Sequence, residues 1–266
     1  MMNTSAHTAR LERSATPRGA EIAVLTIDHP PQNLFDAPLW ESLIEHIAAL
    51  EQAPPRAVLV RAEGPVVCGG ADVAVFGGLD SAGATRLWRD LYDRIVAPLE
   101  VLPCPVVFAA HALTLTAAVE VALACDLIVA HPQAQFGFVE TVVALTPSMG
   151  GIQRLAARAG AGRARKMVLT GELYDAATLY DWGVIDVIAD DTDRAAHALT
   201  ERLADGGTQA HAATKTIVRA WSSSGVAAAD AITPRVAGAL FDTVDTQEAI
   251  RSFRDVGPGK ARFTGC

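Results

Sequence analysis

A single glutamate stands inside an otherwise uncharged, largely apolar run, LTLTAAVEVALAC, at residues 113–125, just before Asp126. This residue is Glu120, and a second acid, Glu140, lies in the segment QFGFVET after a predicted strand. A carboxylate buried without a partner costs on the order of several kcal/mol or takes up a proton, so two of them in apolar surroundings usually serve a function. Such a pair could act as general acid and general base. The structural alternative is that Glu120 points outward on an amphipathic helix and Glu140 is a solvated loop acid.

A glycine-rich segment, VVCGGADV at residues 66–73, could supply backbone hydrogen-bond donors. Gly69 and Gly70 would let the chain turn its N–H groups inward, as the stabilisation of a developing oxyanion requires. Taken in isolation, the segment is better explained as a tight turn in which Asp72 caps the next helix.

Other kinds of site find little support in the sequence. His29 and His111 have no Ser or Cys nucleophile at a recognisable spacing, and lone histidines are more often structural. No cluster of His, Cys and Asp has metal-ligand spacing, so we expect neither a metal nor a cofactor. The nucleotide-binding patterns GxGxxG after a strand and GxxxxGK[ST] are absent. The four cysteines form no CxxC pair, which suits a reducing compartment.

Charge and hydrophobic patterning exclude two classes of partner. The net charge is −8 and the arginines are scattered, so neither nucleic acid nor an anionic membrane surface is expected. Pro103, Pro105 and His111 interrupt the apolar run well short of the roughly 20 residues that a membrane span needs. No N-terminal apolar segment is long enough for a signal peptide; we expect residues 1–18 to be a flexible tail, with a transit peptide as the alternative, and a cytoplasmic location.

Alternating strands and helices must position these candidate residues. Strands are predicted at 21–28, 56–61, 105–110 and 127–130, and helices at 37–52, at 81–102 and through Glu120. This alternation predicts a largely parallel sheet layered against helices. From about residue 150 the chain reads as helices broken by glycine.

Taken together, these segments resemble the enoyl-CoA hydratase/isomerase, or crotonase, family from about residue 20 to the C-terminus. LTIDHPPQNLF resembles the opening strand and RPxxNA-type turn, CGGADV the AGAD segment, and PCPVVFAAHALTLTAAVEVALACDLIVA the segment that carries the first catalytic glutamate. AQFGFVETVVALTPSMGGIQRL resembles the segment with the second. The resemblance therefore implies that Glu120 and Glu140 are catalytic. It also implies that the backbone N–H groups of Ala71 and Ala117 form an oxyanion hole.

Downstream segments extend the resemblance. LTGELYDAATLYDWGVID has the spacing of a TGxxxxAxxAxxxGLV segment, and GKARFTG resembles RKxxFxG, which makes Lys260 a candidate contact for a CoA phosphate. Gly69, Gly70 and Asp72 are implied as further substrate-binding residues. The implied fold is α/β, a crotonase-like spiral of repeated ββα units with a helical C-terminal region. Residues 19–200 would form the acyl-CoA-binding catalytic core and residues 201–266 the oligomerisation region of a homotrimer or hexamer.

The chain departs from the family pattern at the site itself. His111-Ala112 replaces asparagine-glycine, and Thr116, Ala117 and Ala118 replace three glycines. The added methyl and hydroxyl groups are expected to narrow the thioester pocket or shift the second donor. Val139 replaces the proline before the second glutamate.

The resemblance implies an enoyl-CoA hydratase, a carbon–oxygen lyase that adds water to a 2-enoyl-CoA. The presence of both glutamates favours hydratase, because an isomerase can act with one carboxylate, at Glu140. An isomerase, a thioester hydrolase or another crotonase-fold acyl-CoA enzyme is the alternative. A non-catalytic acyl-CoA-binding protein also stays open, since fold alone does not decide function.

Overall fold

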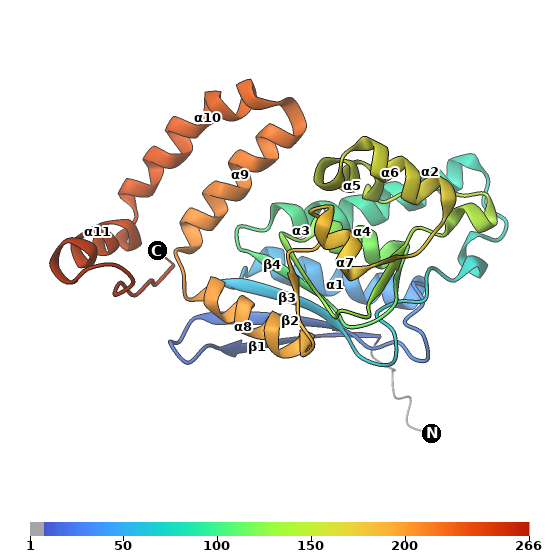
Figure 1. The fold of residues 1–266 in the computed structure, drawn as a ribbon, viewed down its shortest axis with the longest axis horizontal. Helices are drawn as coiled ribbons and strands as arrows, with labels where there is room; N and C mark the ends of the chain where they lie inside the picture. The colour runs from blue at the N-terminus through green and yellow to red at the C-terminus, as the bar shows by residue number, and fades with distance from the viewer. Residues whose placement is uncertain (1–7, 266) are drawn as a thin grey trace.

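Strands and helices alternate along the first two thirds of the chain in the computed structural model, which describes residues 8–265 (Figure 1). The main sheet has the strand order β1-β2-β3-β4-β6-β9. β1 and β2 are antiparallel, and the later pairs in this sheet are parallel. The predicted, largely parallel sheet is therefore confirmed. Its strands are β1 (Ala9–Ala15), β2 (Glu21–Ile27), β3 (Ala57–Ala62), β4 (Val106–Ala110), β6 (Leu127–Ala130) and β9 (Val187–Ile188).

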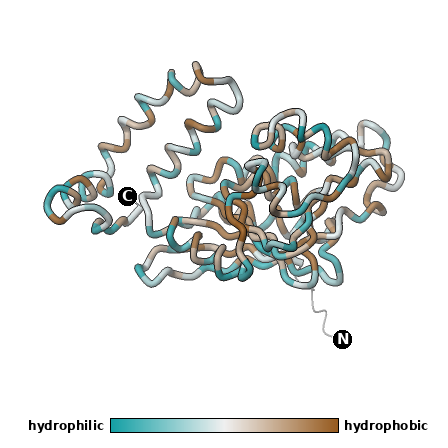
Figure 2. Tube along the Cα trace, in the orientation of Figure 1, coloured by the Kyte–Doolittle hydropathy of each residue, from teal (hydrophilic) through white to brown (hydrophobic). Residues whose placement is uncertain are grey.

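Helices cover both faces of this sheet. Side chains of β3 alternate between the faces: Val58 and Val60 belong to the large core beneath α1 (Ala37–Gln52), whereas Leu59 belongs to a smaller core with α8 (Thr192–Ala204). The α1 stripe predicted from helical spacing is buried, as expected for an amphipathic helix. Figure 2 shows the hydrophobic segments gathered in this central region.

A second, smaller sheet directs the chain toward both glutamates. It consists of β5 (Thr114–Leu115), β7 (Gln135–Gly137) and β8 (Tyr174–Asp175). β5 leads into α4 (Ala117–Ala124), which carries Glu120, and β7 leads to the 3₁₀ helix η3 (Glu140–Val143). Because β5 and β7 are parallel neighbours, the segments that follow them leave the same edge of the sheet.

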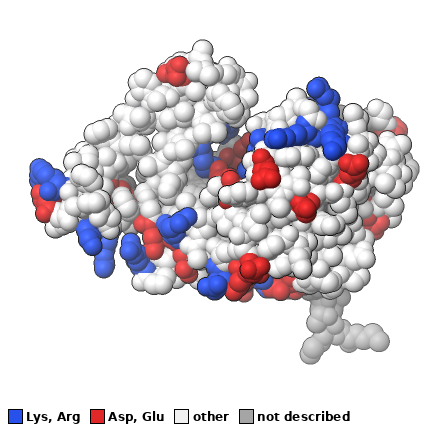
Figure 3. Space-filling view, viewed as in Figure 1, with Lys and Arg blue, Asp and Glu red and all other residues white. Residues whose placement is uncertain are grey.

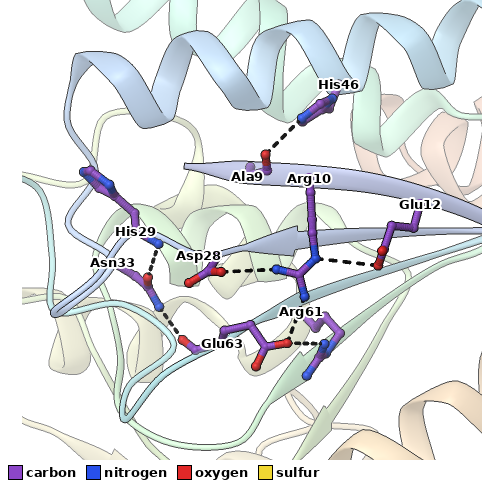
Figure 4. Close-up of polar contacts among 9 residues, drawn as sticks. All are labelled: Ala9, Arg10, Glu12, Asp28, His29, Asn33, His46, Arg61 and Glu63. Atoms are coloured by element: carbon purple, nitrogen blue, oxygen red, sulfur yellow. Dashed lines mark hydrogen bonds and ion pairs between the residues drawn. The ribbon is translucent and has the colours of Figure 1, made fainter. Parts of the chain in front are cut away.

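The N-terminal prediction is wrong in part. Residues 9–15 form β1 rather than belonging to a flexible tail, whereas residues 1–7 lie outside the described residues. Distant partners stabilise this edge strand: its backbone pairs with β2, and Arg10 contacts Asp28 and Glu63 (Figure 4). β1, with the sequence ARLERSA, has no strong hydrophobic pattern. It therefore could not be recognised as a strand from the sequence.

The predicted helix at 81–102 forms in three consecutive pieces: α2 (Ser81–Leu91), a π-helical turn η2 (Tyr92–Val96) and α3 (Ala97–Val101).

Helices make up most of the C-terminal third, as predicted. The helices α5 (Gly151–Ala159), α6 (Ala161–Thr170) and α7 (Ala176–Asp181) follow the second glutamate. The last three helices project from the sheet as an arm: α9 (Thr208–Ser224), α10 (Val226–Ala239) and α11 (Val244–Val256) (Figure 1).

Charged contacts attach this arm to the body. Lys215 on α9 donates to Asp126 Oδ2 at 2.7 Å and to the carbonyl oxygen of Cys104 at 2.9 Å. Arg56 donates to the carbonyl oxygens of Gly206 and Phe263, which holds the C-terminal segment near β3. Between residues 8 and 265, no helix is long and apolar enough to cross a membrane.

Candidate active site

Glu120 lies in the protein interior on α4 and does not point outward. The residue is 3% exposed, and its Oε1 accepts hydrogen bonds from the backbone N–H groups of Met149 and Gly151, both at 2.8 Å. Gly151 is the first residue of α5, so the carboxylate faces the positive end of that helix. These two bonds fix the orientation of the carboxylate, while the structure gives Oε2 no hydrogen bond within the described chain.

Two opposing effects set the protonation of Glu120. Burial raises its pKa to about 7, even though the N–H groups of Gly151 and Met149 favour the anion. A carboxyl group with a pKa near 7 can exchange protons at neutral pH, which an ordinary glutamate does not do.

Glu140 begins η3 and is half-buried beside Glu120. Its Oε2 is buried and has no hydrogen-bond partner within residues 8–265. Burial raises its pKa to about 7, and the negative charge of Glu120 raises it further. Like Glu120, this carboxyl group can therefore exchange a proton near neutral pH. The structure thus brings together the two predicted acids and excludes the solvated alternative for Glu120.

Backbone pairing joins the two segments that carry the proposed oxyanion donors. Cys68 donates its N–H to the carbonyl oxygen of Leu113 at 3.1 Å, and Leu115 donates to the carbonyl oxygen of Cys68, also at 3.1 Å. Ala71 and Ala117 follow these paired residues by three and two positions. The pairing therefore holds both donor segments against each other before the chain turns into η1 (Val73–Phe76) and α4.

Ala71 presents an N–H group that the surrounding backbone does not use. The residues before and after Ala71 are both hydrogen-bonded to Phe35. Phe35 N–H donates to the carbonyl oxygen of Gly70 at 2.9 Å, and the carbonyl oxygen of Phe35 accepts from Asp72 N–H at 3.0 Å. Asn33 holds the turn before Phe35, because its side chain donates hydrogen bonds to the carbonyl oxygens of Glu63 and Val66. Figure 4 shows the bond to Glu63. Ala71 N–H makes no backbone hydrogen bond to another described residue.

Ala117 is the first residue of α4. The N–H groups of a first helical turn have no partner within the helix, so this donor is available to a ligand. The preceding residue is held by its own backbone, because Thr116 N–H donates to the carbonyl oxygen of Gly137 at 2.9 Å. The helix dipole adds partial positive charge at this end of α4.

The remaining predicted contacts have local structural roles. Gly70 has φ +121°, which favours glycine, and a Cβ on Gly69 would lie 3.2 Å from Gln32 Cβ, a close contact. Asp72 caps η1 by accepting from the N–H of Ala74, as the simpler interpretation of the segment predicted. Lys260 follows α11, the last helix of the arm. Its proposed contact with a CoA phosphate stays a prediction.

The histidines and cysteines singled out in the sequence are held by structural contacts. His29 Nε2 lies 2.8 Å from Asp36 Oδ2, and His111 Nε2 lies 2.9 Å from the carbonyl oxygen of Gly64. Cys68 and the other two cysteines that the structure describes are free and buried. Within the described residues, no group of three or more His, Cys, Asp or Glu side chains is arranged to hold a metal ion.

Two groups that orient Glu120 were missed in the sequence, because they are backbone amides. The N–H groups of Met149 and Gly151 reach the carboxylate from a loop about 30 residues away. The glycine pair at 150–151 was the available signal. Gly150 has φ +96°, and a Cβ on Gly151 would lie 2.7 Å from Glu120 Cγ. Both positions thus require glycine for this close approach.

An arrangement of this kind can polarise a carbonyl group with backbone donors and move protons with two carboxyl groups, the chemistry of one class of enzyme. A family model described as "Enoyl-CoA hydratase/isomerase" matches residues 17–264, so the chain belongs to that family. The resemblance in the motifs is therefore confirmed.

Individual relatives agree with this assignment. The chain is 30% identical to a "Probable enoyl-CoA hydratase" of Rhodobacter capsulatus over 98% of this chain and 99% of the relative. It is 26% identical to a "Probable enoyl-CoA hydratase" of Bacillus subtilis over 92% and 95%. The crystal structure of a "putative enoyl-CoA hydratase" of Streptomyces coelicolor A3(2) superimposes with a TM-score of 0.89 at 27% identity, covering 100% of this chain and 97% of the other. The predicted crotonase fold is confirmed.

Proposed function

We propose that this protein is an enoyl-CoA hydratase, which adds water across the double bond of a 2-enoyl-CoA thioester. One observation carries the proposal: two desolvated carboxyl groups, Glu120 and Glu140, each with a pKa raised to about 7, follow neighbouring parallel strands of the small sheet. Members of the family act on acyl-CoA compounds, and within that chemistry hydration is the reaction that uses two such groups.

The proposed oxyanion hole activates the substrate. The thioester oxygen would accept hydrogen bonds from the N–H groups of Ala71 and Ala117, which stabilise the negative charge of an enolate-like transition state. Electron withdrawal toward this oxygen makes the β carbon open to attack by water and lets the α carbon accept a proton.

The environments of the two glutamates suggest different roles. Glu120 already accepts two backbone hydrogen bonds, which favour its anion, so it is suited to take a proton from water. Glu140 has an unpartnered Oε2, and the charge of Glu120 favours its protonated form, so it is suited to donate a proton to the α carbon. The water oxygen bonds to the β carbon, and return of a proton from Glu120 to Glu140 restores the starting state.

Substitution of each glutamate tests the proposal. Glu120→Gln and Glu140→Gln keep the shape of the side chain but remove the exchangeable proton. We expect each to slow the loss of the conjugated-thioester absorbance of crotonyl-CoA by about 10²–10⁴-fold. Butyryl-CoA, which has no double bond to hydrate, should bind each variant as it binds the wild type.

Other outcomes select the alternatives. If Glu140→Gln abolishes turnover and Glu120→Gln does not, the protein is an isomerase, and conversion of a 3-enoyl-CoA to a 2-enoyl-CoA becomes the assay. If the wild type binds butyryl-CoA but leaves crotonyl-CoA and a longer 2-enoyl-CoA unchanged, the hydratase proposal is wrong. Such a result favours an acyl-CoA-binding protein or another reaction.

Several features outside the catalytic pair belong to the same proposal. Figure 3 shows cations gathered over α5 and α6, and those of α6 are Arg163, Arg165 and Lys166. α6 packs against η3, the element that begins with Glu140, and its cations offer anionic CoA a second place to bind besides Lys260. We further propose a homotrimer or hexamer, a cytoplasmic location, and catalysis without metal or redox cofactor.

A further inference from the structure

Thr116 has a backbone conformation that side chains rarely adopt. It has φ +47° and ψ −114° at the sharp turn from β5 into α4, where a β-branched residue is unfavourable. Its backbone is held there at both ends, by the bond from its N–H to Gly137 and by the bond that its carbonyl oxygen accepts from Glu120 N–H. Glycine would meet this requirement without strain. The presence of a threonine at a position that suits glycine points to a role for its side chain.

The Thr116 hydroxyl is buried and unpartnered. The residue is 7% exposed, and Oγ1 has no hydrogen-bond partner in the described part of the chain. Buried hydroxyl groups normally form hydrogen bonds, so this one is costly in the free protein. Strain and an unmet hydrogen bond at one residue are features of functional sites rather than of ordinary turns.

The hydroxyl lies between the two donor segments. A methyl group on Gly70 would be 3.7 Å from Thr116 Oγ1, so Oγ1 faces the loop that carries Ala71. Thr116 itself directly precedes Ala117. Cys68 keeps Gly70 in place, because its Sγ accepts from Gly70 N–H at 3.2 Å. The unpartnered hydroxyl is therefore adjacent to both proposed oxyanion donors.

We propose that the Thr116 hydroxyl donates a third hydrogen bond to the thioester oxygen, beside the N–H groups of Ala71 and Ala117. This inference rests on the proposed binding of an acyl thioester at this site. The negative oxygen supplies the acceptor that the hydroxyl lacks in the free protein, so the bond forms only with ligand and strengthens as charge develops. The threonine therefore does more than narrow the pocket.

The same hydroxyl could also serve as a nucleophile. A residue on a strained strand-to-helix turn, followed by an oxyanion donor, is also how some hydrolases present a nucleophile. A nucleophilic hydroxyl needs a base within hydrogen-bond reach. No described group is hydrogen-bonded to Thr116 Oγ1, which favours the donor role.

Infrared spectroscopy of a bound, unreactive thioester tests the proposal. Butyryl-CoA labelled with ¹³C at the carbonyl would be bound to the wild type and to Thr116→Ser, Thr116→Gly and Thr116→Val. We expect the carbonyl stretch to fall in frequency on binding to the wild type and to Thr116→Ser. We expect a clearly smaller fall with Thr116→Gly and Thr116→Val. Hydration of crotonyl-CoA should fall about 100-fold in the last two variants, as for the loss of one oxyanion donor.

Stability measurements separate this role from a structural one. Thr116→Gly relieves the strained turn, so its melting temperature should equal or exceed that of the wild type. A carbonyl stretch and a hydration rate in Thr116→Gly equal to those of the wild type would overturn the proposal. So would a butyryl adduct on wild-type protein that Thr116→Val lacks, because it would make the hydroxyl a nucleophile.

Failure of this inference can be told apart from failure of the proposed function. If the wild type hydrates crotonyl-CoA and Thr116→Gly does so equally well, only the third donor is wrong. If the wild type does not hydrate crotonyl-CoA but the carbonyl shift still depends on Thr116, the hydratase proposal fails and the third donor stands.

Discussion

Glu120 and Glu140 share one desolvated environment but differ in what surrounds each carboxyl group. Backbone N–H groups of two other residues stabilise the anion of Glu120, whereas no hydrogen bond from another described residue reaches the carboxyl group of Glu140. This asymmetry explains how two chemically identical side chains can take opposite roles in proton transfer.

An acid and a base that both have raised pKa values predict a bell-shaped pH profile. Both pKa values are raised to about 7, so at low pH both carboxyl groups are protonated and the base is lost; at high pH both are ionised and the acid is lost. We expect kcat/KM for crotonyl-CoA to be highest near pH 7 and to fall about tenfold per pH unit beyond each limb. Initial rates between pH 5 and pH 9 measure this. A rate independent of pH across that range would contradict the assigned roles.

At the scale of elements, short connections place the site. β5 and β7 are parallel neighbours, and each leads within a few residues to one glutamate. The loop before α5 then closes over Glu120 with two amide groups. Small displacements of this loop should therefore affect catalysis more than folding.

Gly151→Ala tests the closeness of that loop. The added Cβ would lie 2.7 Å from Glu120 Cγ and 2.8 Å from Phe138 Cζ, so Glu120 or the loop must shift. We expect kcat for hydration to fall about 100-fold, as for a displacement of about 1 Å at a catalytic group. Steady-state kinetics with crotonyl-CoA provide the measurement.

Gly162→Ala is the matched control for this variant. It places the same methyl group in α6, where a Cβ has no atom within 4 Å. Its kcat should equal that of the wild type. Equal activity of both variants would show that the site tolerates movement of Glu120.

At the scale of the whole molecule, buried charges join the helical arm to the sheet. Lys215 and Asp126 are mostly buried, at 14% and 29% side-chain exposure, and lie 2.7 Å apart. Burial raises the pKa of Asp126, while Lys215 opposes that rise. Loss of Lys215 would leave the Asp126 carboxylate mostly buried and without the cation that now lies 2.7 Å from it.

Lys215→Met should therefore lower the free energy of unfolding by about 2 kcal/mol, somewhat less than for a fully buried pair. Denaturant titration followed by circular dichroism measures the change. Arg254→Gln breaks an exposed pair with Asp255 and should change stability by less than about 0.5 kcal/mol. Equal effects of the two substitutions would exclude an anchoring role for Lys215.

Exposed apolar side chains on the arm favour an oligomer. Several large residues of this region are about half exposed or more: Val218, Trp221, Phe241, Val244, Phe253 and Val256. Such side chains gathered on one region often lie at a protein interface. We expect sedimentation to show a trimer or hexamer, and Phe253→Glu to shift it toward monomer. A wild-type monomer at micromolar concentration would contradict this proposal.

The sequence by itself determined the alternation of elements, the helical C-terminal third and the two glutamates. These follow from local patterns: Ala37–Gln52 has a helical stripe, and β2 and β3 are short apolar runs. The glycine segment at 69–72 was likewise visible, because glycine marks turns that other residues cannot form. Together with the order of its motifs, this was enough to identify the family.

Only the tertiary structure decided what depends on distant contacts. β1 is held by Arg10 and by pairing with β2. The carboxylate of Glu120 is oriented by amides about 30 residues away. The Thr116 hydroxyl is unpartnered because no described hydrogen-bonding group lies within reach of it. Backbone amides carry no sequence signature, and a missing hydrogen bond is a property of a packed environment. The raised pKa values also arise from burial, which exists only once the sheets and helices have closed around the site.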